Sequence, residues 1–82
     1  MTTKDLIYQY VKQERRYQDE KWGTIDERPH TVREWIAIMS SKMRDAEDAW
    51  MNQGDSEAMM EVMQAIAVGF ALMEQHGGRP AR

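Results

Sequence analysis

Apolar residues recur at alternating spacings of four and three between residues 32 and 73, and this pattern constrains the fold more than any other feature. One such series is Val32, Ile36, Met39, Met43, Ala46 and Trp50. Another is Met59, Val62, Ile66, Gly69 or Phe70, and Met73. The spacing predicts two helices, each with an apolar seam of the kind that packs against an antiparallel neighbour. Because no segment alternates apolar and polar residues over the length of a strand, the sequence predicts an all-α fold.

Capping signals indicate where the first two helices begin. The first helix is predicted over about residues 3–21 and the second from residue 31, after a loop over residues 23–30 that contains Gly23 and Pro29. In both places a threonine precedes an acidic residue by three positions, which is the spacing of a capping box. The two pairs are Thr2 with Asp5, and Thr31 with Glu34.

A short polar break separates the second helix from the third. Gly54 suits a helix end, and Asp55 or Ser56 is expected to cap a third helix over about residues 56–76. Because the connection is so short, the two helices should form an antiparallel hairpin. The predicted architecture is therefore an N-terminal helix added to a helical hairpin.

The length of the chain predicts one small domain that needs a partner. Eighty-two residues bury only about 60–65% of the unfolded surface, so the core is marginal. The chain has no cysteine, which excludes disulfides and thiolate zinc sites. We therefore expect residues 1–78 to form a single helical domain that assembles as a homodimer or tetramer, with a flexible tail at residues 79–82.

Charge and hydropathy exclude several classes of partner. The net charge is −3, from 11 basic and 14 acidic residues, and gives no electrostatic footprint for nucleic acid. No apolar run approaches the roughly 20 residues of a membrane span. The first residues also lack the apolar segment of a signal peptide. We expect a soluble cytoplasmic protein with neither a nucleic-acid nor a membrane partner.

Two polar pairs, each three residues apart, lie beside the apolar seams. They are Lys42 with Asp45 and Glu61 with Gln64. Residues at this spacing share a helix face, so Asp45 and Glu61 should approach each other across the hairpin. Their carboxylates suit magnesium, which prefers oxygen ligands and retains waters beside phosphate oxygens. The simpler interpretation, solvated charges at the edge of a bundle, is favoured from spacing alone.

The segment from residue 16 to 23 places Trp22 beside Lys21 at a helix end. An indole next to an ammonium group suits a nucleotide, because one stacks on a base and the other pairs with a phosphate. In the alternative interpretation, Trp22 folds against the loop and the charges stay solvated. His30 and His76 have no partner at ligand spacing, so a histidine metal site is not expected.

Taken together, these segments resemble the all-α MazG-like nucleotide pyrophosphohydrolase superfamily, in particular its short subfamily from bacteria, phages and mobile elements. The likeness extends from about residue 6 to 77, and the Gln-Asp-Glu-Lys-Trp-Gly motif at residues 18–23 is its most specific part. Residues 14–15, 30–39, 45–50 and 61–69 carry the remainder.

The resemblance implies helical dimers or tetramers that hydrolyse a nucleoside triphosphate to monophosphate and pyrophosphate with magnesium. The metal-binding pairs of the family, E-x-x-E and E-x-x-D, fall on Lys42 with Asp45 and on Glu61 with Gln64. A further acid often precedes the first pair, and Ser41 stands at its place. Asp45 and Glu61 therefore match the family, whereas Ser41, Lys42 and Gln64 depart from it. The implied substrate contacts are Gln18, Lys21 and Trp22.

The departures leave three hypotheses open. A shifted magnesium site built from Asp45, Asp48 and Glu61, with Glu57 as a further candidate, would preserve an enzyme. Alternatively, Lys42 replaces the charge of the metal and forms a salt bridge with Asp45 or Glu61. That favoured hypothesis predicts a catalytically weak or inactive nucleotide-binding or protein-interaction dimer from a mobile element. The third hypothesis is a structural helical dimer without a ligand.

Overall fold

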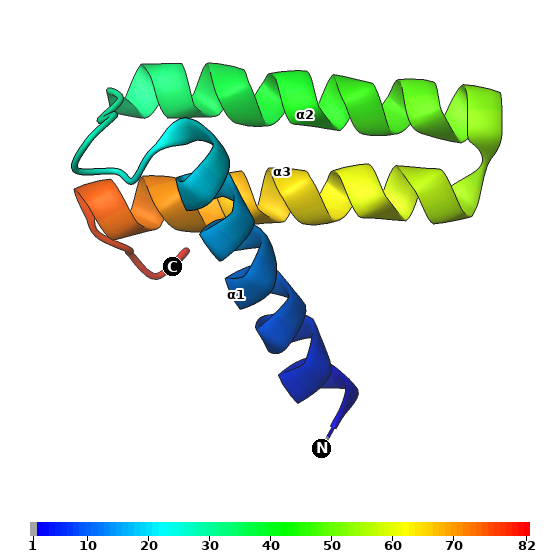
Figure 1. The fold of residues 1–82 in the computed structure, drawn as a ribbon, viewed down its shortest axis with the longest axis horizontal. Coiled ribbons are helices and arrows are strands. Elements are labelled where there is room, and N and C mark those ends of the chain that lie inside the picture. Colours follow the sequence, from blue (N-terminus) through cyan, green and yellow to red (C-terminus); the bar gives the residue numbers. More distant parts are fainter. Residues whose placement is uncertain (1) are drawn as a thin grey trace.

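The computed structural model describes residues 2–82, and this part of the chain contains three α-helices and no strand. They are α1 (Thr3–Trp22), α2 (Val32–Gln53) and α3 (Asp55–His76). As Figure 1 shows, α2 and α3 lie side by side as an antiparallel hairpin, and α1 crosses α3 so that its N-terminal half projects away from the hairpin. The predicted all-α class, with a hairpin and an N-terminal helix, is confirmed.

Capping boxes begin α1 and α2 as the sequence predicts. The hydroxyl oxygen of Thr2 accepts from the backbone N–H of Asp5 at 3.1 Å, and that of Thr31 accepts from Glu34 at 3.1 Å. In each box the acidic side chain accepts from the threonine N–H in return. These pairs satisfy backbone donors that have no partner within the helix.

The start of α3 differs from the prediction. Gly54 is both the C-cap of α2 and the N-cap of α3, and no side chain caps the N-terminus of α3. Its φ of 100° lies in a region that glycine adopts without the steric cost of a Cβ atom. Asp55 does not cap the helix because it is already the first residue of α3. Its Oδ1 accepts instead from the indole N–H of Trp50 at 2.9 Å. A one-residue connection leaves no room for a separate capping residue.

The core lies along α3, which packs against both other helices. Its most buried side chains are small: Ala65, Ala67, Val68 and Ala71 are at most 2% exposed. Small residues let neighbouring helix backbones approach closely, and Trp35 of α2 packs against Val68 and Ala71. The buried cluster is therefore concentrated where α1, α2 and α3 come together.

The apolar seams pack within the hairpin only in part. Most of their residues are 39–64% exposed and form what we call the outer stripe: Val32, Ile36, Met43, Trp50, Met59, Ile66, Phe70 and Met73. The helices meet through the remaining seam residues Met39 and Ala46, and through a neighbouring row that includes Trp35 and Ala65. One member of the stripe, Phe70, lies beside α1, where it lines a groove with Tyr8 and Val11. For the exposed seam residues the prediction was wrong, because the apolar surface of each helix is wider than one contact face.

By length and composition α3 could cross a membrane, with a mean hydropathy of 1.3 over its most apolar window. The expectation that no apolar run approaches this length was therefore too strict. In the fold, α3 is the helix that contacts both others, and core helices of globular domains share such a composition.

Candidate functional site

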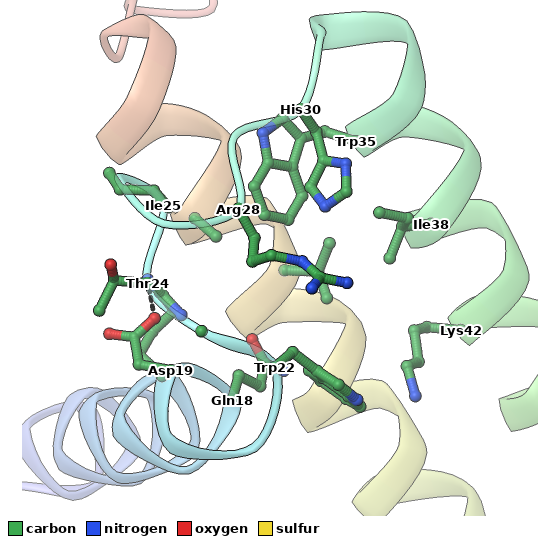
Figure 2. Close-up of a pocket in the computed structure, with 14 residues that line it drawn as sticks. Gln18, Asp19, Trp22, Thr24, Ile25, Arg28, His30, Trp35, Ile38 and Lys42 are labelled. Atoms are coloured by element: carbon green, nitrogen blue, oxygen red, sulfur yellow. Dashed lines mark ion pairs between the residues drawn. The ribbon is translucent and has the colours of Figure 1, made fainter.

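A pocket of about 290 Å³ lies between the end of α1, the 23–30 loop and the hairpin. Every element of the fold contributes to its wall, and Figure 2 shows the side chains that converge on it. Gln18 and Trp22 come from α1, Arg28 from the loop, and Trp35 and Lys42 from α2. The lining thus combines aromatic rings with cationic groups.

Gln75, near the end of α3, holds the loop against the hairpin. Its Oε1 accepts from the backbone N–H of His30 at 3.1 Å and from the indole N–H of Trp35 at 2.8 Å. Its Nε2 donates to the carbonyl oxygen of His30 at 2.7 Å. One amide therefore makes three hydrogen bonds that close the pocket at this end.

The two histidines, which the sequence gave no reason to connect, meet at the same place. Nε2 of His76 lies 2.8 Å from the carbonyl oxygen of His30. The His30 ring contacts Trp35 edge to face, with centroids 4.7 Å apart. Because the His76 ring contacts the backbone of His30 and not its side chain, no sequence pattern could have predicted this contact.

A third capping box, missed by the sequence analysis, shapes the loop. The hydroxyl oxygen of Thr24 accepts from the N–H of Glu27, and the N–H of Thr24 donates to the Glu27 carboxylate at 3.0 Å. This hydrogen bond from the Thr24 backbone lowers the pKa of Glu27 below its ordinary 4.5. Arg28 closes the turn by donating its N–H to the Thr24 carbonyl at 2.8 Å. The Thr-x-x-Glu spacing could have revealed this turn.

Gly23 gives Arg28 its position over the pocket. A Cβ atom at residue 23 would lie 2.9 Å from Cγ of Arg28, and the φ of Gly23 is 94°. Both facts require glycine at this place. Figure 2 shows the Arg28 side chain extending across the pocket toward Ile38 and Lys42.

Arg15 joins α1 to α3 and is paired with two carboxylates. Its guanidinium donates to Glu74 at 2.5 Å and lies 3.1 Å from Asp19, while only 9% of the residue is exposed. Burial alone would lower the pKa of Arg15, but the hydrogen bond and charge of Glu74 outweigh it, so the pKa is raised. Arg15 therefore contributes a paired charge to the pocket wall.

Gln18, an implied substrate contact, lines the pocket but also has a structural role. It is 4% exposed, and its Nε2 donates to Glu14 at 3.2 Å and to the backbone carbonyl of Gln64 at 3.1 Å. Both hydrogen atoms of the amide nitrogen thus have partners. Its main effect is to fix α1 on α3 beside one of the positions where the resemblance implies a metal ligand.

Lys42 stands at another position where the resemblance implies a metal ligand, and its ammonium group contacts Gln64. Its Nζ donates to Oε1 of Gln64 at 3.3 Å and lies 5.2 Å from the centroid of the Trp22 ring. Lys21 lies 5.0 Å from the same ring but does not line the pocket. The expected salt bridge from Lys42 to Asp45 or Glu61 is not formed in residues 2–82, because the neutral Gln64 amide takes its place.

The acidic candidates lie nearer the α2–α3 turn. Since Lys42 faces Gln64 across an antiparallel pair, Asp45 and Glu61 occupy the next level of the hairpin. Asp45 and Asp48 are exposed, whereas Glu61 is half-buried. Within the described part of the chain, no three carboxylate or imidazole groups gather in a way that could hold a metal ion.

The side chains at the four family positions do not fit magnesium. Two of them, Lys42 and Gln64, are hydrogen-bonded to each other, and an ammonium group repels a divalent cation. Ser41, at the place of the additional acid, is exposed and carries no charge. The remaining carboxylates, Asp45 and Glu61, supply too little negative charge to replace those that are missing.

The fold and the pocket define a small three-helix protein with a pocket lined by aromatic and cationic side chains. Of the three cations in the lining, Arg15 is paired, whereas Arg28 and Lys42 make no ion pair within residues 2–82. No family model, curated protein or solved structure matches the chain.

Proposed function

We propose that the protein is a MazG-like helical protein that binds a nucleotide in this pocket without hydrolysing it. The observation that carries the proposal is the hydrogen bond between Lys42 and Gln64, which joins two positions where the resemblance implies metal-binding acids. The resembling motif at residues 18–23 supplies part of the lining, including Gln18, Trp22 and Gly23. Sequence likeness and pocket therefore coincide at the same place.

The chemistry of this arrangement favours binding over hydrolysis. Magnesium-dependent hydrolysis needs a cation that both neutralises phosphate charge and activates a water molecule. The Lys42 ammonium group performs the first task, because it is positive and faces the pocket. It cannot perform the second, since an ammonium group does not coordinate a water molecule and lower its pKa as a metal ion does. A bound nucleotide would be stabilised but not attacked.

The aromatic lining suits the base of a nucleotide. Trp22 is 45% exposed, so its indole remains accessible to a ligand. Stacking of a base on an aromatic side chain contributes about 1–3 kcal/mol. The apolar side chains of Ile25 and Ile38 complete a wall that excludes water from one side of the ligand.

Pyrophosphate release and thermal shift, measured together, test this proposal. We expect nucleotides to raise the melting temperature, with no pyrophosphate released above background when magnesium and a panel of nucleoside triphosphates are present. Release above background would contradict the proposal. The absence of both effects would favour the structural helical dimer.

The register of the hairpin is also compatible with a competing function, an enzyme with a shifted metal site. Asp45 and Glu61 share a level of the helix pair, so a shifted metal site with Asp48 and Glu57 would lie beside the pocket. If that site supports an enzyme, pyrophosphate release should fall to background in the Asp45→Asn variant. The matched Asp26→Asn variant, in the loop, should retain it.

The outer stripe supports self-association. It follows helical spacing on both helices of the hairpin and is exposed along its length. Two such hairpins can bury these faces against each other as a four-helix bundle, which is a self-complementary arrangement. We therefore propose a homodimer through the outer stripe, none of whose residues lines the pocket.

A further inference from the structure

We infer that the pocket recognises a single phosphate monoester joined to an aromatic base, a nucleoside monophosphate, and that it does so without a divalent cation. This inference rests on the proposed nucleotide binding and specifies the ligand class. It follows from the charges that face the pocket, the positions of two cationic side chains and the size of the space.

The number of unpaired charges matches one phosphate. Arg15 is paired with two carboxylates, Asp19 and Glu74, so within residues 2–82 Arg28 and Lys42 are the lining cations without an ion pair. A phosphate monoester carries about −1.5 to −2 charges at pH 7. The additional charges of a triphosphate are those that nucleotide enzymes neutralise with magnesium, whose ligand positions are here altered. Two unpaired cations therefore match the charge of a monophosphate better than that of a triphosphate.

The two cations come from opposite walls of the pocket. In Figure 2, Arg28 extends from the loop and Lys42 from α2, and both lie near Trp22. The guanidinium of Arg28 presents a planar fork that suits two phosphate oxygens. Lys42 donates one hydrogen bond to Gln64, which leaves two of its three donors for a ligand. The anion would therefore lie between preformed donors.

The size and lining of the pocket suit a ligand with one base. A space of about 290 Å³ lies just below the range of about 300–1,000 Å³ for small-molecule sites. The exposed ring of Trp22 offers a stacking surface next to the two cations. A base and its phosphate can thus be held by adjacent groups.

Calorimetry in the presence of EDTA tests the inference with four nucleoside monophosphates, the matching nucleosides, ribose 5-phosphate and inorganic phosphate. At least one monophosphate should bind about tenfold or more tightly than its nucleoside, as expected for charged hydrogen bonds. It should also bind about tenfold or more tightly than ribose 5-phosphate and than inorganic phosphate. Adding magnesium should leave its affinity unchanged. Equal affinity for the nucleoside, or for a phosphate without a base, would overturn the inference.

Nucleoside triphosphates distinguish failure of this inference from failure of the proposed function. If a triphosphate with magnesium binds more tightly than every monophosphate, the inference is wrong while nucleotide binding stands. If no nucleotide binds with or without magnesium, both are wrong.

Substitutions locate the site. Arg28→Gln and Lys42→Gln should each weaken monophosphate binding about tenfold, because each removes one charged contact. Arg33→Gln, which removes an exposed cation of α2 that does not line the pocket, should leave binding unchanged. Circular dichroism verifies that each variant is folded. Unchanged affinity in both pocket variants would overturn the inference.

Discussion

The two ends of the α2–α3 hairpin are built in opposite ways. At one end α1 and the loop cover the hairpin, and Gln75 and Arg15 tie them down with hydrogen bonds and ion pairs. At the other end the helices meet at Gly54, and large apolar side chains such as Trp50 and Met59 are more than half exposed. A single chain therefore completes its core only around the pocket. The rest of the hairpin is suited to a second copy.

The largest expected effect is the loss of the polar clamp at the closed end. Gln75→Leu removes three hydrogen bonds and leaves two donors, on His30 and Trp35, without their partner. We expect the free energy of unfolding to fall by about 3–4 kcal/mol, because each unsatisfied buried group costs about 1–3 kcal/mol. Urea denaturation measures the change. Gln53→Leu at the open end, where the side chain is exposed, should stay within about 0.5 kcal/mol; equal effects would refute the contrast.

The next effect concerns the outer stripe. The double variant Ile66→Glu, Phe70→Glu places two charges in the proposed dimer interface, and should raise the dimer dissociation constant by at least about 100-fold, as for central interface residues. Sedimentation velocity should show a folded monomer. Met51→Glu, which lies off the stripe and is 75% exposed, should remain dimeric. A wild-type protein that is monomeric at all concentrations would show that the outer stripe has another role.

A smaller effect should follow from weakening the junction between α1 and α3. Glu74→Gln removes the charge that Arg15 binds but leaves Asp19 as its partner. We expect a loss of about 1–2 kcal/mol in thermal unfolding experiments, since one hydrogen bond to a charged group is weakened. The exposed Glu57→Gln is the matched control. If the two variants are equally stable, the ion pair does not hold α1 in place.

The smallest predicted effect is a pH dependence at the start of α2. The backbone N–H of Thr31 donates to Glu34 and lowers its pKa below the ordinary 4.5. Because the pKa is lower in the folded state, this contribution is present above pH 4.5 and disappears as the pH falls through the folded value. Glu34→Gln keeps an acceptor that does not titrate. The stability advantage of the wild type over this variant should therefore decrease between pH 6 and pH 3, and a constant difference would argue against it.

The sequence was sufficient to predict the helices but not their rotation. Threonine–acid pairs and glycines mark helix ends through local hydrogen bonds, so the ends of α1 and the start of α2 could be identified. The heptad pattern predicts an apolar face on each helix but does not predict which residues pack against it. The small residues of α3 lie on the inner side because they allow close packing, and Trp35 packs against them. Residues such as Ile36 and Ile66 remain on the outer side.

The candidate site divides in a similar way. The spacing of three residues identified Lys42 and Gln64 as neighbours of the seams, and their contact across the hairpin follows from an antiparallel pair. The clamp from Gln75 to His30 joins residues 45 positions apart, and no local pattern encodes it. Arg28 was missed because its position depends on Gly23 and on the turn at Thr24.

Magnesium calorimetry on the wild type and on the double variant Lys42→Glu, Gln64→Glu tests the central claim most directly. The claim is that the contact between Lys42 and Gln64 has replaced a metal site at the edge of the pocket. We predict no magnesium binding by the wild type and measurable binding by this variant, in which four carboxylates occupy the two levels of the hairpin. The same charge change at Lys4 and Gln13, both exposed on α1, should give no binding. Wild-type protein that binds magnesium as tightly as the double variant would contradict the claim.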